Sequence, residues 1–390
     1  MLLRLLPARR HAVVHGWPAD EGNAVEVLRA LRRRYRGRVY WLLDDADVRV
    51  PDLAAPELDD RSRVVRLRKS TPRGVLLALT AETTFFTHGL YTAVRPPSDR
   101  LVVNLWHGDG PKSASDTRLV CSTVAVAGTR LWGAQRAGRF GLPEHAVAVV
   151  GNPRTDQLRA GLPAGARARL GLREQGPLVV WVPTYREARG PGSRGWRDGE
   201  HLSDSHGVAA LVGEMARTAR ALGVELVVKP HPLDADSFGP LGLPVLRGPD
   251  LTAAGVSLYQ LLGACDALIS DVSSIWTDFL ALDRPVAFYL PDLDDLQRRR
   301  GLNVDDLEAL LPGPRIATAE DAARFLQGVV ARSPDLRPSR HPAHARIGPV
   351  AEPGATDRLL DWLDAFQRRR GRPALFFPPD AGRLDRSQPS

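Results

Sequence analysis

The residues that could do chemistry in this sequence stand in five short motifs, each directly after a run of apolar residues of strand length. The motifs are Trp106-His107-Gly108 with Lys112, Gly151 to Asp156, Pro183 to Arg186, Lys229 to Pro232, and Ser270 to Ser274. In open α/β sheets, ligands bind outside the carboxyl ends of the strands. We therefore expect all five motifs to face one crevice if two such sheets oppose each other.

Two histidines are the candidates for acid–base chemistry. His107 precedes a glycine, which permits close approach of backbone or substrate, and its imidazole can act as a general base or a hydrogen-bond donor near neutral pH. His231 stands between Pro230 and Pro232, which fix the backbone and prevent continuation of a helix or sheet. A rigid imidazole at a loop tip suits catalysis or phosphate contact. A histidine beside a tryptophan is otherwise usually a core residue, and this alternative stays open for His107.

Basic side chains in the same motifs predict a diphosphate site. Arg154, Arg186 and Lys229 supply positive charge, and an arginine can bind phosphate through two parallel hydrogen bonds. Judged one at a time, each of them is as readily explained by a surface salt bridge. Their common position after predicted strands favours the site.

The run from Cys265 to Leu280 predicts a strand, a tight turn and a helix start. Ala267 to Ser270 is the buried strand, Asp271 closes the turn, and Ser273 or Ser274 is the N-cap. The start of a helix presents free backbone N–H groups and the positive end of the helix dipole to a phosphate. The alternative is that the serines only cap the helix.

The helix after this turn is predicted to run from Ser274 to Leu282, because Pro285 ends it. Its predicted buried face consists of Ile275, Phe279 and Leu282. Asp278 lies one turn from Ser274, where its carboxylate can accept hydrogen bonds from ribose hydroxyls. The alternative is that Asp278 only stabilises the first turn through the dipole.

Composition excludes several classes of protein. The 390 residues suit two domains, and 43% hydrophobic with 25% charged residues is typical of a soluble globular protein. Cys121 and Cys265 are too few for a disulfide framework and favour a reducing compartment. No apolar stretch is long enough to span a bilayer, and the first residues are expected to be mature protein. No dinucleotide, P-loop or serine hydrolase motif is present; no metal site is expected, and Asp292 to Asp295 is predicted to be a solvated loop.

The formal net charge of +8 is carried mostly by arginine, in the clusters 32–34, 298–300 and 368–370. Such clusters suit a phosphate-bearing substrate, an anionic lipid surface or a nucleic acid. A GC-rich genome would produce the same composition. No nucleic-acid-binding signature accompanies the charge, so we do not expect a nucleic-acid partner.

Alternating strands and helices predict an α/β fold with two doubly wound, Rossmann-like domains. The predicted strands are 11–16, 39–43, 64–67, 84–87, 101–106, 146–150, 178–182, 224–228, 267–270 and 286–290. The predicted helices are 23–34, 74–80, 208–222, 258–264, 274–282, 319–331 and 354–370. The predicted divisions are a domain over 1–160, a linker over 161–165, a domain over 166–350, a final helix over 353–370 and a disordered tail over 371–390. Residues 187–206, rich in Gly, Arg, Ser and Asp, are predicted to form a mobile loop or lid.

Taken in order, and with Asp278, Arg284-Pro285 and Tyr289, the five motifs resemble those of the CDP-glycerol glycerophosphotransferase family, the teichoic acid primases and polymerases. The resemblance covers about residues 10 to 365. It implies a GT-B fold with an acceptor-side N-terminal domain, a CDP-donor-binding C-terminal domain and a last helix that crosses back. It also implies transfer of glycerol phosphate, or a related polyol phosphate, from a CDP-activated donor to a lipid-linked or polymer hydroxyl, with release of CMP and without a cofactor. Such enzymes work at the cytoplasmic face of the cell membrane, so the expected protein is cytoplasmic and peripheral on an anionic membrane.

By this likeness His107 matches the family's catalytic histidine, His231 matches its second essential histidine, and Ser273, Ser274 and Asp278 match its donor-binding segment. Arg154, Arg186 and Lys229 are expected to join the donor site, and Lys112 and Asp271 to lie in the same cleft. Val272 stands where the family usually has an aromatic residue, and no long N-terminal membrane-targeting or repeat extension is expected. Two rival functions remain: a GT-B glycosyltransferase or epimerase that uses a sugar nucleotide, and a basic lipid- or nucleic-acid-binding module.

Overall fold

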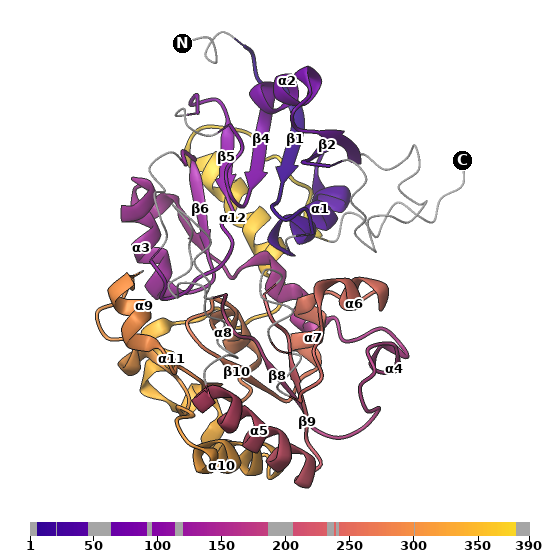
Figure 1. Ribbon diagram of the computed structural model, residues 1–390. Coiled ribbons are helices and arrows are strands. Elements are labelled where there is room, and N and C mark those ends of the chain that lie inside the picture. The colour runs from indigo at the N-terminus through magenta and orange to yellow at the C-terminus, as the bar shows by residue number, and fades with distance from the viewer. Residues whose placement is uncertain are drawn as a thin grey trace. The chain divides into compact units, whose positions relative to one another are not determined.

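The computed structural model describes residues 6–20, 22–45, 64–91, 96–113, 120–185, 206–231, 238, 242–299 and 301–379. These residues form two compact units, each built around its own parallel sheet (Figure 1). Unit 1 comprises Met1–Gly108, Ser115–Asp156 and Glu352–Ser390, and unit 2 comprises Asp109–Ala114 and Gln157–Ala351. The predicted α/β class is therefore confirmed. Assignment of Asp109–Ala114 to unit 2 was not expected from the sequence.

Unit 1 contains a seven-stranded sheet in the order β3-β2-β1-β4-β5-β6-β7, with every pair parallel. Its strands are β1 (Arg9–His15), β2 (Arg38–Leu43), β3 (Val64–Arg68), β4 (Ala81–Phe86), β5 (Leu101–Asn104), β6 (Val124–Ala127) and β7 (Val147–Val149). Most apolar residues of these strands are buried, as is typical of a parallel sheet, whereas Val65 and Leu67 of the edge strand β3 are half-buried. In the register, Val13 of β1 aligns with Tyr40 on one side and Thr84 on the other.

The helices of unit 1 are α1 (Gly22–Arg34), α2 (Pro72–Thr80), α3 (Arg130–Phe140) and α12 (Ala355–Arg369), with the 3₁₀ segment η4 (Glu144–Ala146). The 3₁₀ segment η5 (Pro153–Arg159) begins in unit 1 and ends in unit 2. α1 and the last helix α12, yellow in Figure 1, share one core cluster with the sheet. The buried Arg34 of α1 joins them, because its guanidinium contacts Asp357 at 2.8 Å and Asp361 at 2.5 Å. α12 is therefore part of unit 1.

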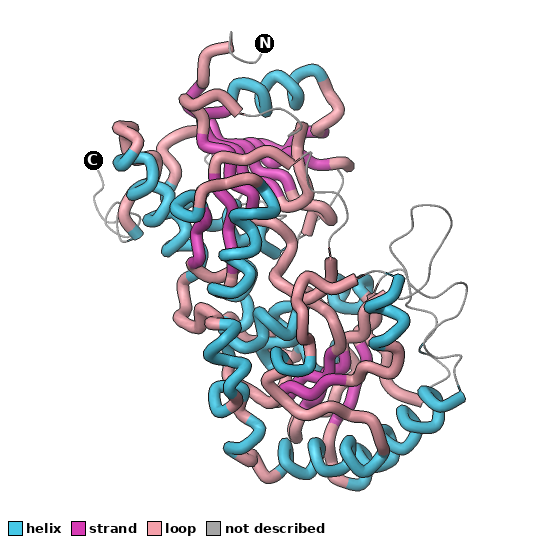
Figure 2. Tube along the Cα trace, turned by 90° about the vertical axis from the view of Figure 1, so that its left-hand side faces the viewer, coloured by secondary structure: helices cyan, strands magenta, loops and turns pink. Residues whose placement is uncertain are grey.

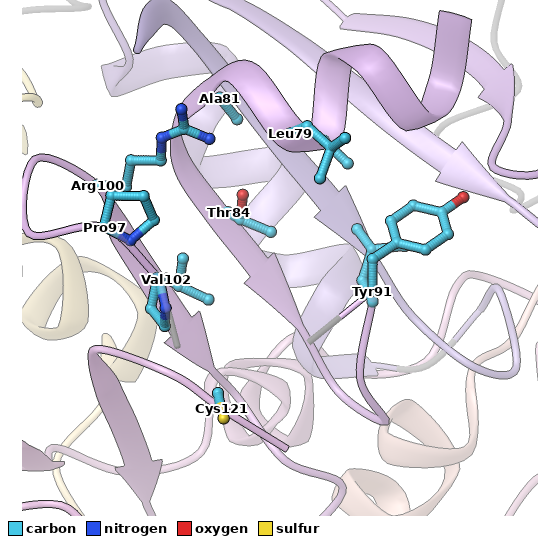
Figure 3. Close-up of a pocket in the computed structure, with 11 residues that line it drawn as sticks. Leu79, Ala81, Thr84, Tyr91, Pro97, Arg100, Val102 and Cys121 are labelled. Atoms are coloured by element: carbon cyan, nitrogen blue, oxygen red, sulfur yellow. The ribbon is translucent and has the colours of Figure 1, made fainter. Parts of the chain in front are cut away.

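On the face of the unit 1 sheet that packs against α2, a small apolar pocket of about 50 Å³ lies next to β4 and β5 (Figure 3). Leu79, Thr84, Tyr91 and Val102 line it. None of the motif residues lines this pocket.

Unit 2 contains a four-stranded parallel sheet in the order β11-β10-β8-β9. Its strands are β8 (Leu178–Trp181), β9 (Glu225–Val228), β10 (Ala267–Ser270) and β11 (Val286–Phe288). Its helices are α4 (Ala166–Arg169), α5 (His206–Ala221), α6 (Gly248–Ala253), α7 (Leu258–Ala264), α8 (Ile275–Phe279), α9 (Leu293–Arg299), α10 (Ala319–Val330) and α11 (Pro342–Ile347). Residues of α5 and α10 share one core cluster with this sheet, and Figure 2 shows the strands in magenta among cyan helices.

Three details of the prediction were wrong. β6 and α3 were not predicted, although Thr129 caps α3 and Gly141 ends it in the left-handed conformation. The predicted helix 274–282 is the five-residue α8, followed by the 3₁₀ turn η8 (Leu280–Leu282). Its fully buried side chains are Trp276, Phe279 and Leu280, whereas Ile275 and Leu282 are only half-buried.

The predicted disordered tail was also wrong for its first part. Phe376 is 2% exposed and forms an antiparallel bridge with Tyr35, and the Phe377 N–H donates to the Arg34 carbonyl at 2.7 Å. Leu375 and Phe376 belong to the core cluster that α1 shares, so this segment packs against α1. The rest of the predicted tail, from residue 380, lies outside the described residues.

Candidate active site

The topological switch point of the unit 1 sheet is where its candidate residues gather. The strand order runs outward from β1 to β3 and then resumes on the other side of β1 with β4, so the reversal lies between β1 and β4. Ligands bind at the carboxyl ends of the strands at such a point. Trp17 follows β1, His88 follows β4 and His107 follows β5.

These three side chains are in contact. The imidazole rings of His88 and His107 are stacked, with centroids 4.1 Å apart and planes inclined by 11°. Trp17 meets His88 edge-on at 5.3 Å, and the Thr87 hydroxyl lies 3.0 Å from His88 Nδ1. The Trp106 ring packs against His107 at 4.2 Å. Two neighbouring rings therefore restrict the orientation of the half-buried His107 imidazole.

Side chains also hold the backbone that carries His107. Trp106 has a φ of 58°, in the left-handed region, and Gly108 has a φ of 125°, which favours glycine. The Trp106 N–H donates to Asn104 Oδ1 at 3.0 Å, and its carbonyl accepts from Asn23 Nδ2 at 3.1 Å. Asn23 and Asn104 are both fully buried. A strained elbow of this kind persists only where surrounding contacts over-determine it.

Arg154 completes this arrangement. Its backbone N–H donates to Asn23 Oδ1 at 3.1 Å, and its Nη1 donates to the His107 carbonyl at 3.0 Å. The side chain is 7% exposed. These contacts show that Arg154 positions His107. Its expected contact with the donor diphosphate stays a prediction.

Asp156, the last residue of the same motif, caps α12. Its carboxylate accepts from the backbone N–H groups of Gly354, Ala355 and Thr356 at 2.8–3.0 Å, and from the Thr356 hydroxyl at 2.7 Å. A carboxylate at a helix N-terminus satisfies free donors and favours the dipole. The motif Gly151 to Asp156 therefore contacts both the His107 backbone, through Arg154, and the start of α12, through Asp156.

In unit 2, Asp271 joins the loops that follow two neighbouring strands. Its carboxylate accepts from the Thr184 N–H at 2.8 Å and the Thr184 hydroxyl at 2.5 Å, after β8. It also accepts from the Ser273 N–H at 3.0 Å, after β10. Asp271 is 1% exposed. Its contacts fix the loop that carries the serine pair.

The serine pair itself is half-buried, and Ser274 packs against Gly110. A Cβ on Gly110 would lie 3.0 Å from Ser274 Cα, so a larger residue there would crowd the Ser274 backbone. The Thr277 hydroxyl donates to the Asp109 carbonyl at 2.8 Å. Ser273 Oγ lies 3.4 Å from the Ile275 N–H, and Ser274 makes no capping bond through its side chain. With a five-residue α8, the helix dipole contributes less than the predicted longer helix would.

Asp278 is placed differently from the expectation. It is 4% exposed, and its carboxylate accepts a hydrogen bond from the Tyr259 hydroxyl at 2.6 Å. A buried carboxylate is stabilised by such a bond. The geometry favours a structural role for Asp278 over ribose binding, which stays a prediction.

Three other predicted residues are described in unit 2. Lys229 is 7% exposed, and its Nζ donates to the Pro230 carbonyl at 2.9 Å. His231 is exposed, and its ring lies 5.5 Å from that of Tyr185. Lys112 forms an antiparallel bridge with Leu302. Arg186, Pro232 and nearly all of the predicted lid lie outside the described residues.

Sequence reasoning missed four of these residues. His88 immediately follows a strand pattern, so the rule that selected the five motifs would also have selected it. Asn23, Tyr259 and Asn303 carried no such signal. Asn303 Nδ2 donates to the Gly110 carbonyl at 2.8 Å, across a long separation in sequence. Pairings of that kind are visible only in the fold.

Within the ranges that the structure describes, no cluster of three or more His, Cys, Asp or Glu side chains could hold a metal ion. A search of the same ranges for helices with the length and apolar character needed to cross a membrane also finds none.

Known proteins resemble this chain in sequence and in fold. The teichoic acid poly(glycerol phosphate) polymerase of Bacillus subtilis (strain 168) is 26% identical over 173 residues, which cover 44% of this chain and 21% of that protein. The chain spans between 16% and 36% of the length of the curated relatives it matches. A solved structure of the wall teichoic acid polymerase TagF has a TM-score of 0.68 at 15% identity and covers 95% of this chain and 92% of that one. A TagF variant soaked with CDPG has a TM-score of 0.66 at 16% identity and covers 94% and 91%.

The solved structures confirm the predicted GT-B fold with two Rossmann-like domains. The sequence model of the CDP-glycerol:poly(glycerophosphate) glycerophosphotransferases matches residues 18–364, almost the whole of the predicted range. The chain therefore belongs to the CDP-glycerol:poly(glycerophosphate) glycerophosphotransferase family.

Proposed function

We propose that this protein transfers glycerol phosphate, or a related polyol phosphate, from a CDP-activated donor to a hydroxyl group and releases CMP. Its family membership supports this proposal, as does its likeness to TagF, one variant of which was soaked with CDPG. The product would belong to a teichoic-acid-like or capsular polymer.

The observation that supports the proposal most directly is the fixed geometry of His107 in the backbone turn Trp106-His107-Gly108, which we call the His107 elbow. The imidazole is half-buried, its ring is stacked on His88, and its backbone is held by Asn23 and Arg154. An acid–base group is most effective when its geometry is fixed before the substrate arrives. His107 therefore takes the role of general base in our proposal.

In the proposed step, the acceptor hydroxyl oxygen attacks the β-phosphorus of the CDP-alcohol in line. The hydroxyl proton passes to the His107 imidazole. The bond between the β-phosphorus and the oxygen that bridges to CMP breaks, and CMP leaves with that oxygen. Phosphoryl transfer depends mainly on positioning and on neutralising charge, which basic side chains and N–H donors can supply.

Unit 2 supplies the groups that would neutralise this charge. His231, Arg186 and the Ser273–Ser274 loop would contact the diphosphate and the leaving CMP. The support is that Asp271 fixes Thr184 in the loop after β8 and Ser273 in the loop after β10, at the carboxyl ends of adjacent strands. His231 follows β9, which pairs with β8 on its other side. The convergence of these residues with His107 on one crevice stays a prediction from the sequence.

We further propose a lipid-linked or polymer hydroxyl as the acceptor and the inner face of the cell membrane as the place of work. The support is the net charge of +8 and the teichoic acid polymerases among the relatives.

The test is a panel of donors. The protein is incubated with CDP-glycerol, CDP-ribitol and UDP-sugars, each with a hydroxyl acceptor, and release of CMP or UDP is measured together with product mass. We expect CMP and a product heavier by one polyol phosphate unit. Release of UDP alone would instead support a sugar-nucleotide enzyme of the same fold.

A further inference from the structure

The three arginine clusters of the sequence are not equivalent in the structure. Arg34 is buried and forms ion pairs with Asp357 and Asp361, which join α1 to α12 and compensate its charge. Arg298 of α9 forms an ion pair with Asp295 at 2.6 Å. Both clusters therefore have part of their charge compensated within the protein.

The third cluster is at the end of α12. Arg368, Arg369 and Arg372 are exposed. Arg368 interacts electrostatically with the Asp364 carboxylate one turn away, whereas neither Arg369 nor Arg372 pairs with a carboxylate in the part of the chain that the structure describes. Among the described residues, Arg370 donates to two neutral oxygens, the Ser98 carbonyl at 2.6 Å and Gln367 Oε1 at 3.3 Å. Burial and the nearby Arg372 lower the pKa of Arg370. An anion bound at this end of α12 would reduce the electrostatic repulsion between Arg370 and Arg372.

Aromatic rings accompany these arginines. Trp362 and Phe366 are stacked, with centroids 5.2 Å apart and planes inclined by 12°. The Arg369 guanidinium lies 5.8 Å from the Trp362 ring, and that of Arg370 lies 5.4 Å from the Phe366 ring. Trp362 is only half-buried. We call these two aromatic residues, with arginines 368, 369, 370 and 372, the α12 basic surface.

A groove of about 450 Å³ adjoins the α12 basic surface. Pro143, Ala146 and Phe366 contribute its apolar wall, and Arg369 and Arg370 line it as well. The surface thus combines exposed arginines, an aromatic pair and an apolar recess. Arginine with interfacial tryptophan is the combination that contacts lipid headgroups and the outer part of the acyl region.

We infer that the α12 basic surface is the face of unit 1 that binds an anionic phospholipid bilayer, which serves the proposed function by bringing the protein to a membrane acceptor. The arginines contact lipid phosphates, and Trp362 lies at the headgroup level. A nucleic acid fits less well, because the Trp362 ring already stacks on Phe366 and Arg369, which leaves less ring face for a base. The alternative is that the arginines only stabilise the end of α12 through its dipole.

The experiment compares two variants with equal loss of charge. Arg368→Gln with Arg369→Gln changes the α12 basic surface, and Arg298→Gln with Arg299→Gln is the control on α9. Each variant lowers the formal net charge of +8 by two. Binding is measured by co-sedimentation with vesicles of phosphatidylcholine alone and of equal parts phosphatidylcholine and phosphatidylglycerol. Melting temperatures check that both variants are folded.

We expect the α12 variant to bind anionic vesicles roughly thirtyfold more weakly than the wild type, and the α9 variant to lose much less. Equal losses in both variants, or no loss in the α12 variant, would overturn the inference. So would a loss of single-stranded DNA binding with vesicle binding intact. If the Arg369 replacement lowers the melting temperature, Arg368→Gln with Arg372→Gln replaces it in the comparison.

The vesicle assay needs neither donor nor acceptor, so its outcome does not depend on the transferase reaction. CMP release with a short soluble acceptor is measured separately on the same variants and should equal that of the wild type. Absence of CMP release from the wild type would count against the proposed function alone.

Discussion

The imidazole rings of His88 and His107 lie almost parallel, with centroids 4.1 Å apart, at the switch point of the unit 1 sheet. His88 is itself held by the Thr87 hydroxyl and the edge of Trp17. Because His88 follows β4 and is held there, its stacking on His107 restricts the orientation of the His107 side chain after β5. His88 acts as a positioning residue for His107.

We expect His88→Ala to lower kcat about tenfold and to leave the KM for the donor nearly unchanged, because the freed His107 ring samples unproductive orientations. His88→Phe, which keeps a flat ring in the stack, should retain most of the activity. Steady-state CMP release measures both. A His88→Phe variant as impaired as His88→Ala would show that the imidazole itself is needed and not its stacking.

His107→Ala and His231→Ala should each lower turnover by about 10²–10⁴-fold, the usual range for loss of an acid–base group. Both residues follow strands, and neither lies deep in a core. CMP release is measured on variants that circular dichroism shows to be folded. A variant with nearly wild-type turnover would remove the role assigned to its histidine.

Asn23 and Arg154 should act as one unit. Asn23 binds the Trp106 carbonyl and the Arg154 N–H, and Arg154 binds the His107 carbonyl, so both hold the same elbow. We expect Asn23→Ala and Arg154→Ala each to reduce kcat, and the double variant to lose less than the product of the two effects. Asn303→Ala, which removes an amide that binds Gly110 in unit 2, is the control partner for Arg154→Ala. Independent effects of Asn23 and Arg154 would contradict a shared role.

Hydrophobic periodicity predicted the α/β class and most strands and helices, since parallel strands buried on both faces are continuous apolar runs. It missed β6, although Val124 to Ala127 is an apolar run as long as the predicted strand 267–270. It also failed for the end of α8, because Asp283 adopts a left-handed conformation and the last turn tightens to a 3₁₀ helix before Pro285.

For the site, the rule that polar residues follow strands found His107, Asp271 and the serine pair. It does not find the partners that hold them. Asn23 lies in a helix and Tyr259 begins another, and both reach their partners through tertiary packing. Contacts between residues far apart in sequence depend on register and on side-chain direction, which one sequence does not specify.

In unit 2, we expect different substitutions to affect the stability of the fold and the affinity for the CDP donor. Tyr259→Phe removes the hydrogen bond to the buried Asp278 and should cost about 1–3 kcal/mol of stability. Its affinity for CDP should stay unchanged. Ser273→Ala with Ser274→Ala should weaken CDP binding with little loss of stability. Calorimetric titration with CDP and thermal unfolding measure the two quantities; wild-type CDP affinity in the serine variant would place the donor elsewhere.

The stability of unit 1 should depend on pH through two buried histidines of β1. His11 donates to the Leu77 carbonyl at 2.8 Å and His15 to the Leu42 carbonyl at 2.9 Å, and they are 5% and 1% exposed. Burial lowers the pKa of each imidazole below the usual 6.5, because desolvation disfavours the charged form.

The unfolded chain therefore binds more protons than the folded chain between the lowered pKa values and about pH 6.5. The resulting stability is fully present above about pH 6.5 and is lost as the pH falls through the folded pKa values, at up to about 1.4 kcal/mol per pH unit for each histidine. Hydrogen exchange of the β1 amides, corrected for the intrinsic pH dependence of exchange, measures the free energy of opening. In the double variant His11→Gln with His15→Gln, the free energy of opening should fall less steeply as the pH decreases. His145→Gln, at an exposed position, should not change this slope. An unchanged slope in the double variant would assign the acid sensitivity to other groups.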